Sequence, residues 1–133
     1  MSLASVRNRL QKIAELLDAP RPYAGFRTQP LHDGSAHCEF DGEYYHYILS
    51  ERGETYGQKR TDDAEKLLFW LVADMTVKMA IDYELADREP DIDGRRIWFP
   101  YHVELLRRVN EDWASKQDAK YAETLAANPY NDG

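Results

Sequence analysis

Apolar residues recur every three or four positions along the first seventeen residues, which is the pattern of an amphipathic helix. Charged residues such as Arg7 and Lys12 fall between them. Pro20 and Pro22 interrupt the pattern, because proline lacks a backbone donor and restricts the residue before it. We therefore predict a helix and then irregular chain over residues 1–35. The apolar positions are Leu3, Val6, Leu10, Ile13 and Leu17.

Between residues 36 and 60 the pattern changes to short runs of residues that favour strands. The runs 36–40 and 43–49 flank Asp41–Gly42, and their aromatic and β-branched residues suit a half-buried sheet. An Asp-Gly pair between two such runs favours a two-residue hairpin turn, because both turn positions adopt positive φ. A third strand over residues 54–59 follows the break at Gly53, although Gly57 weakens its pattern. We expect two or three antiparallel strands.

Helical patterns occupy residues 61–133. Thr61–Asp62–Asp63 offers helix-capping side chains, and neither proline nor glycine interrupts the chain from there to Ala86. Apolar residues cover so much of this helix that it must be packed on more than one side. After an acidic turn over residues 87–94, a second helix is predicted over residues 101–109. A third is predicted from Asn110 until Pro129 ends it.

This order of elements predicts an α+β fold. An N-terminal helix comes first, a small antiparallel sheet follows, and three helices including a long central one complete the chain. Because 133 residues is the usual size of one domain, we expect a single domain over residues 1–133. Within it we distinguish an N-terminal helix and loop (1–35), a β-hairpin region (36–60) and a helical region (61–133).

Charge is distributed unevenly along the chain. Residues 1–60 carry 8 Lys+Arg and 8 Asp+Glu, whereas residues 61–133 carry 9 and 16, so the whole net charge of −7 lies in the second half. A phosphate backbone requires clustered Lys and Arg, so we expect no nucleic-acid partner. An acidic surface is compatible with a cationic protein partner, whose encounter it would accelerate. The alternative is that the acidity serves only solubility.

Several further features bear on location and chemistry. No apolar run approaches the roughly 20 residues of a membrane helix, and the N-terminus has no apolar signal core. The single cysteine, Cys38, cannot form an internal disulfide, which fits a reducing compartment. We expect a soluble, cytoplasmic protein with no membrane partner. The chain also lacks a phosphate-binding glycine loop and a paired-cysteine or helical two-histidine pattern, so we expect no metal and no cofactor.

Two groups of charged residues are more informative. Residues 51–54 follow the aromatic strand, and their opposite charges either pair across the sheet or form only a turn. The second group begins with Glu84 and Arg88, whose i, i+4 spacing with glutamate first is the favourable order on a helix. It ends with two arginines that precede apolar residues and therefore need carboxylate partners. We assign to a structural charged network Glu51, Arg52, Glu84, Arg88, Asp93, Arg95 and Arg96.

At these residues the chain resembles a known family. In their order and spacing the motifs resemble immunity protein family sixty-three of bacterial polymorphic-toxin systems, over roughly residues 44–132. One departure is Gly94, where the resemblance leads us to expect a bulkier residue. The residues that carry the resemblance are Glu51–Arg52–Gly53 with Glu54, Thr61–Asp62–Asp63, Tyr83–Glu84 with Arg88, Asp93 with Arg95–Arg96 and Phe99, Trp113, and Asn128–Pro129–Tyr130 with Asp132.

The resemblance implies a cytoplasmic antitoxin, encoded beside its cognate toxin, that acts by binding and occlusion. It implies no catalytic residue, so we expect a protein that is not an enzyme. Two alternatives stay open: a small enzyme that uses the carboxylate and arginine cluster, and a generic homo-oligomeric adaptor domain. The sequence leaves the toxin, its activity and the oligomeric state undefined. From the acidic half and its aromatic residues, our candidates for partner binding are Asp87, Glu89, Asp91, Asp112, Asp118, Tyr101 and Tyr130.

Overall fold

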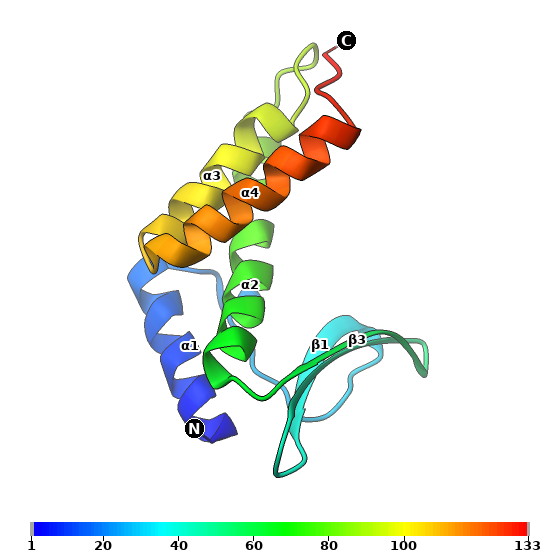
Figure 1. The fold of residues 1–133 in the computed structure, drawn as a ribbon. Helices are drawn as coiled ribbons and strands as arrows, with labels where there is room; N and C mark the ends of the chain where they lie inside the picture. Colours follow the sequence, from blue (N-terminus) through cyan, green and yellow to red (C-terminus); the bar gives the residue numbers. More distant parts are fainter. Residues whose placement is uncertain (1, 133) are drawn as a thin grey trace. The chain divides into compact units, whose positions relative to one another are not determined.

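The fold is taken from a computed structural model of the chain, which describes residues 2–132. An α-helix precedes a three-stranded sheet, and further α-helices follow it, which confirms the predicted α+β fold (Figure 1). The elements are α1 (Leu3–Leu17), the 3-10 helix η1 (Arg21–Tyr23), β1 (Asp33–Phe40), β2 (Tyr45–Glu51), β3 (Glu54–Thr61), α2 (Ala64–Ala86), α3 (Arg95–Arg107) and α4 (Glu111–Ala127).

These elements form two compact units. Unit 1 contains the described residues up to Leu16 together with Ala24–Val72, and unit 2 contains Leu17–Tyr23 and the described residues from Ala73 onward. Helix α2 contributes its first part to unit 1 and its second part to unit 2. The single domain over residues 1–133 stays a prediction. Among residues 2–132, no helix is both long enough and apolar enough to cross a membrane.

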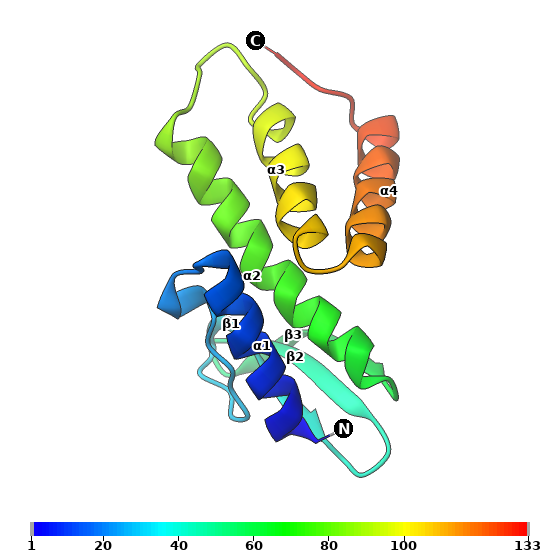
Figure 2. The ribbon, with the colours of Figure 1, turned by 90° about the vertical axis from the view of Figure 1, so that its left-hand side faces the viewer.

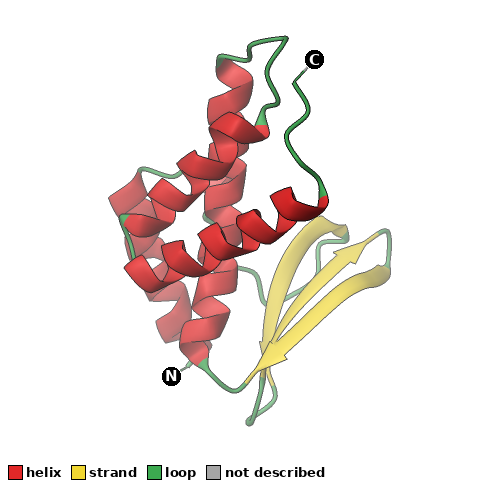
Figure 3. Cartoon of the chain, turned by 45° about the horizontal axis from the view of Figure 1, so that its top comes forward, coloured by secondary structure: helices red, strands yellow, loops and turns green. Residues whose placement is uncertain are grey.

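The sheet of unit 1 is antiparallel with the strand order β1-β2-β3 (Figure 3). The central strand β2 buries Tyr45, Tyr47, Ile48 and Ser50, whereas β3 buries only its last residue, Thr61. Strand β3 pairs with β2, so the predicted third strand is confirmed. It ends at Thr61, two residues later than predicted.

The first hairpin differs from the predicted two-residue turn. Residues 41–44 connect β1 to β2, and the Asp41 N–H donates to the Tyr44 carbonyl over 3.2 Å. The Asp41 carboxylate also accepts from the N–H groups of Glu43 and Tyr44, at 2.9 and 2.7 Å. These bonds stabilise a four-residue loop in which only Gly42, at φ 97°, needs the left-handed region. The hairpin is at the predicted position, but its turn is two residues longer.

A two-residue turn of the predicted kind connects β2 to β3 instead. Arg52 and Gly53 have φ values of 53° and 82°, and Glu51 pairs with Glu54 across the turn. Positive φ at both central residues matches the right-handed twist of the strands. The sequence pattern missed this turn because arginine, unlike asparagine or aspartate, does not signal positive φ.

The core of unit 1 includes apolar residues of α1 and of the first part of α2. Val6 and Leu10 from α1 and Leu67 and Leu68 from α2 are at most 1% exposed. Asp63 caps α2 by accepting from the N–H of Glu65 over 2.9 Å. The predicted α1 and α2 are thus confirmed with the expected apolar faces.

In unit 2, α3 and α4 lie side by side and antiparallel (Figures 1 and 2). Asn110 caps α4 and accepts from the Trp113 N–H over 3.2 Å, as the sequence predicted. The predicted start of α3 at residue 101 is wrong, because the helix begins at Arg95 and contains Pro100. Pro100 cannot donate to the carbonyl four residues earlier, and the helix nevertheless continues through it to Arg107.

Candidate partner-binding surface

Four charged residues of unit 2 fasten the C-terminal segment to the start of α3, and we call Asp93, Arg95, Arg96 and Asp132 the C-terminal clamp. The Asp93 carboxylate pairs with the Arg95 guanidinium, with an Nη2–Oδ2 distance of 2.7 Å. It also accepts from the N–H of Asn131 over 2.9 Å. The Asp132 carboxylate pairs with Arg96 over 2.9 Å and accepts from the N–H of Asp93 over 2.8 Å. Each charge of the clamp therefore has an opposite partner.

The arginines of the clamp also hold the backbone and the ring of the segment after α4. Arg95 donates to the carbonyls of Asn128 and Pro129 over 2.9 and 2.8 Å. The Arg96 guanidinium lies over the Tyr130 ring, 4.2 Å from its centroid, which is the geometry of a cation–π contact. The clamp is thus a structural device that positions Tyr130.

Ionisation of the clamp follows from these contacts. The hydrogen bond from Arg95 lowers the pKa of Asp93, and the backbone N–H groups of Asn131 and Arg95 lower it further. The hydrogen bond from Arg96 is the largest of the causes that lower the pKa of Asp132. The same pairs raise the pKa values of both arginines. All four groups are charged at neutral pH.

Glu84 occupies a separate place at the end of α2. Its side chain is 2% exposed and pairs with Arg88, with a distance of 3.0 Å from Nε to Oε1. Its carboxylate lies against Gly94, so that a Cβ added at Gly94 would be 2.1 Å from Oε1. A negative charge is favourable there, because the first turn of α3 presents the positive end of the helix dipole. The glycine that departs from the family pattern therefore makes room for a buried carboxylate.

The predicted charged network is in fact several separate pairs. The structure brings Asp93, Arg95 and Arg96 together with Asp132, and it pairs Glu84 with Arg88. Glu51 and Arg52 belong to the β2–β3 hairpin of unit 1, and no ion pair joins either of them to another residue within 2–132. With Glu54 and Tyr56 they instead line a surface depression of about 540 Å³.

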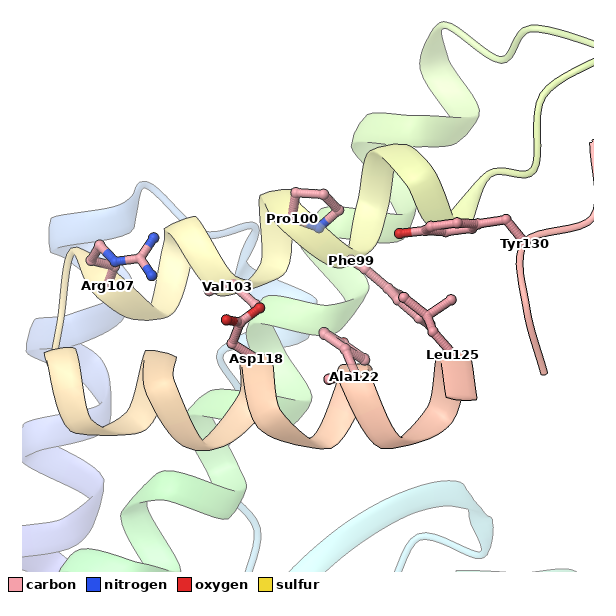
Figure 4. Close-up of a pocket in the computed structure, with 9 residues that line it drawn as sticks. Phe99, Pro100, Val103, Arg107, Asp118, Ala122, Leu125 and Tyr130 are labelled. Atoms are coloured by element: carbon pink, nitrogen blue, oxygen red, sulfur yellow. The ribbon is translucent and has the colours of Figure 1, made fainter. Parts of the chain in front are cut away.

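A pocket of about 310 Å³ opens between α3 and α4 (Figure 4). Figure 4 shows Asp118 directed from α4 toward α3, with Arg107 and Tyr130 at the two ends of the row of lining residues. Its residues come from unit 2 alone, and most of them are apolar or aromatic. Such a lining with a few polar groups is typical of ligand and hot-spot pockets. The pocket is lined by Phe99, Pro100, Val103, Arg107, Asp118, Tyr121, Ala122, Leu125 and Tyr130.

A buried polar chain supports one wall of this pocket. Thr76 donates to the Ala73 carbonyl over 3.3 Å, so its oxygen accepts from Nε2–H of His102 over 2.8 Å. The other ring nitrogen of His102 then accepts from the Tyr121 hydroxyl. Burial lowers the pKa of His102 to about 4, so the imidazole is neutral at pH 7. Burial also raises the pKa of Tyr121. This chain connects α2, α3 and α4 through neutral groups.

The predicted acidic partner-binding residues are all exposed. Asp87, Glu89 and Asp91 lie on the loop between α2 and α3, and Asp112 lies in the first turn of α4. Asp118 is on the rim of the pocket. No ion pair joins any of these five carboxylates to another described residue. They differ in this respect from the carboxylates of the clamp.

The two predicted aromatic anchors have different surroundings. Tyr101 is half-buried and stacks on Tyr83, with ring centroids 4.0 Å apart and an interplanar angle of 8°. Tyr130 lines the pocket and lies beneath Arg96. Tyr130 shares its pocket with a predicted acidic residue, Asp118.

Sequence reasoning missed most of the pocket. Phe99 was named only as part of the family resemblance, and neither Val103 nor Leu125 was predicted as a site residue, because a pocket depends on how two helices pack. The signal that was available is the spacing of the apolar positions on the second and third predicted helices, which predicts facing stripes. Asp132 was part of the family pattern, but no role was assigned to it.

The charge of unit 2 follows from its composition. It carries 9 Lys+Arg and 14 Asp+Glu, a net charge of −5, and unit 1 carries the remaining −2. The acidic excess therefore lies mainly in the unit that holds the pocket and the exposed carboxylates.

Comparison with known proteins gives one match. The sequence pattern of the family described as Immunity protein 63 matches residues 41–123, which is more than half of the chain. No curated protein and no solved structure matches the chain. The matched region contains both hairpin turns, α2, α3 and most of α4.

Proposed function

The chain belongs to the immunity protein 63 family, and from that premise we propose that it binds and neutralises a cognate toxin of a bacterial polymorphic-toxin system. Binding in the cytoplasm would occlude the active site of the toxin or the entry of its substrate. The family match over residues 41–123 carries this proposal, because an immunity protein requires a protein partner.

The exposed carboxylates of unit 2 support a basic partner. Asp87, Glu89 and Asp91 are close in sequence on one loop and have no opposite charge among the described residues. The net charge of −5 on this unit would attract a cationic surface and accelerate association. Toxin domains that act on nucleic acids present such surfaces, because they bind phosphates.

The enzymatic alternative gains no support from the charged cluster. Asp93, Arg95 and Arg96 are engaged with one another, with Asp132 and with the backbone of the C-terminal segment. Membership of an immunity protein family also suggests a protein that is not an enzyme. A homo-oligomeric adaptor makes a different prediction, namely self-association without a partner.

Co-expression with the toxin domain encoded by the adjacent gene tests the proposal. We expect the full chain to restore growth of cells that express the toxin, and the two purified proteins to elute from a sizing column as one complex. A toxin that kills in the presence of the chain, together with separate elution, would contradict the proposal. Elution of the chain alone as an oligomer would favour the adaptor.

Two matched variants locate the contact surface. The loop variant replaces three exposed carboxylates of unit 2 by amides: Asp87→Asn, Glu89→Gln and Asp91→Asn. The unit 1 control variant makes the same change of charge at exposed positions of unit 1: Glu15→Gln, Glu43→Gln and Glu54→Gln. We expect the loop variant to bind the toxin more weakly than the control variant does, because of these two sets of residues only the loop carboxylates are predicted to face the partner.

A further inference from the structure

The rim of the α3–α4 pocket combines an exposed carboxylate with an apolar floor. Asp118 is exposed on α4 and lines the pocket with Val103 and Leu125. Its neighbours three and four positions along the helix are Ala114, Ser115, Tyr121 and Ala122, none of which is a cation. No ion pair joins Asp118 to another described residue.

Arg107 is the cation on the same rim, and its charge is already engaged. Its guanidinium pairs with Glu104 over 3.5 Å and with Glu111 over 3.3 Å. In Figure 4, Arg107 extends from the far end of α3, whereas Asp118 points toward Val103. The pocket therefore presents a carboxylate without a cationic partner beside an apolar surface.

We propose that the α3–α4 pocket receives one basic side chain of the partner protein, with arginine preferred over lysine. The cation would pair with Asp118, and the methylene groups of its stem would cover Val103 and Ala122, as long basic side chains do on apolar surfaces. A volume of about 310 Å³ accommodates one such side chain. Arginine is preferred because its planar guanidinium is weakly hydrated and stacks on aromatic rings such as Tyr121.

Charge selects this occupant over an apolar or acidic one. An apolar side chain would bury Asp118 without a partner, which is unfavourable. An acidic side chain would approach a carboxylate in a unit of net charge −5. The charge of a basic side chain pairs with the carboxylate, and its methylene groups cover the apolar floor. Arginine is also common among interface hot spots. This inference rests on the proposed function, since the side chain belongs to the partner.

An NMR titration of the full chain with small probes tests the pocket without the toxin. Nα-acetyl-arginine methylamide carries the proposed side chain, and the matching norleucine and glutamate derivatives carry an apolar and an acidic one. We expect the arginine probe to shift the methyl signals of Val103, Ala122 and Leu125 saturably, with a dissociation constant on the order of millimolar. The glutamate probe should leave those signals unchanged, and the norleucine probe should bind more weakly than the arginine probe.

Two single substitutions on α4 supply the control. Asp118→Asn should weaken binding of the arginine probe by about fivefold, as expected for a partly exposed ion pair. Glu123→Gln removes the same charge at an exposed position of the helix outside the pocket lining and should leave the affinity unchanged within about twofold. Absence of saturable shifts at the pocket methyl groups, or equal binding of the arginine and glutamate probes, would overturn the proposal.

The toxin assay distinguishes this inference from the proposed function. If the full chain binds and neutralises the toxin equally well with Asp118→Asn, the pocket does not receive a basic anchor, while the immunity function stands. If the unmodified chain forms no complex with the toxin, the immunity function fails, whatever the probes do.

Discussion

Unit 2 contains two groups of carboxylates, one of which is paired with arginines and the other of which is not. In the C-terminal clamp, Asp93 and Asp132 each pair with an arginine and accept backbone hydrogen bonds. On the α2–α3 loop and the rim of the pocket, carboxylates such as Asp91 and Asp118 are exposed, and no ion pair joins them to another residue within 2–132. The same residue type therefore has two different surroundings within about forty residues.

The paired charges stabilise the fold, whereas the carboxylates without an ion pair are available to contact a partner. A charge that is paired and hydrogen-bonded fixes the chain around it, and its loss leaves a partner group unsatisfied. An exposed carboxylate without a partner contributes little to stability, and it is available to steer a cationic protein. Substitutions in the clamp should therefore change folding, and those on the rim should change binding.

Acid should produce the largest effect on stability, and it acts on the pocket wall before the clamp. The pKa of His102 is about 4 in the folded protein and about 6.5 when unfolded, so its neutral form favours the fold. This contribution is complete above pH 6.5 and is lost as pH falls toward 4, by up to about 3 kcal/mol. Chemical denaturation at a series of pH values measures it.

A His102→Asn variant tests whether this pH dependence belongs to His102. It should be less stable than the unmodified chain at neutral pH and should lack the decline between pH 6.5 and 4. The pKa values of Asp93 and Asp132 are lowered, so their contribution is present above the unfolded pKa and is lost only as pH falls through the lower folded value. An identical pH dependence in both proteins would contradict the assignment to His102.

Gly94→Ala should give the next largest effect. The new methyl group would lie 2.1 Å from Oε1 and 2.8 Å from Cδ of Glu84, and that carboxylate is buried. We expect a loss of about 2 kcal/mol in the free energy of unfolding, because overpacking forces the side chain to move. Gly25→Ala is the matched control, since its new contact is the flexible end of Arg27 at 3.1 Å. A Gly94→Ala protein as stable as this control would show that Glu84 moves freely.

Arg95→Ala should act locally on the C-terminal segment. The substitution removes the partner of Asp93 and the donor to the carbonyls of Asn128 and Pro129. We expect the amide of Asn131, which donates to Asp93, to exchange with solvent at least about tenfold faster. Arg108→Ala at the C-cap of the same helix is the control and should leave that amide unchanged. Equal exchange in the two variants would mean that the clamp does not hold the segment.

Asp118→Asn should have the smallest effect on folding. The side chain is exposed and no ion pair joins it to another described residue, so the free energy of unfolding should change by less than about 0.5 kcal/mol. Thermal denaturation beside the unmodified chain measures this. A loss comparable to that of Gly94→Ala would place Asp118 among the architectural charges and weaken its assignment to the pocket rim.

Local patterns predicted much of the fold. Helices α1, α2 and α4 followed from apolar periodicity and capping residues, because both are properties of neighbouring positions. The start of α3 did not, since Pro100 lies within the helix and the preceding loop is polar. The turn at Arg52–Gly53 was missed because its first residue adopts a φ of 53° that arginine does not signal.

The site was less predictable, for a physical reason. The pair of Glu84 and Arg88 follows from helical spacing, whereas Arg96 and Asp132 are 36 residues apart and meet only after the helices pack. Gly94 illustrates the same limit. The sequence marked it as a departure from the family pattern, and only the fold shows that the Glu84 carboxylate occupies the space of the missing side chain.

The most direct test of the central claim compares association rates of the loop variant and the unit 1 control variant with the toxin domain at low ionic strength. Both variants carry the same net charge, so a difference between them reports where the partner binds. We predict that the loop variant associates roughly tenfold more slowly than the unmodified chain, whereas the control variant stays within about twofold of it. Equal rates in the two variants would contradict the claim that the unpaired carboxylates of unit 2 form the binding surface.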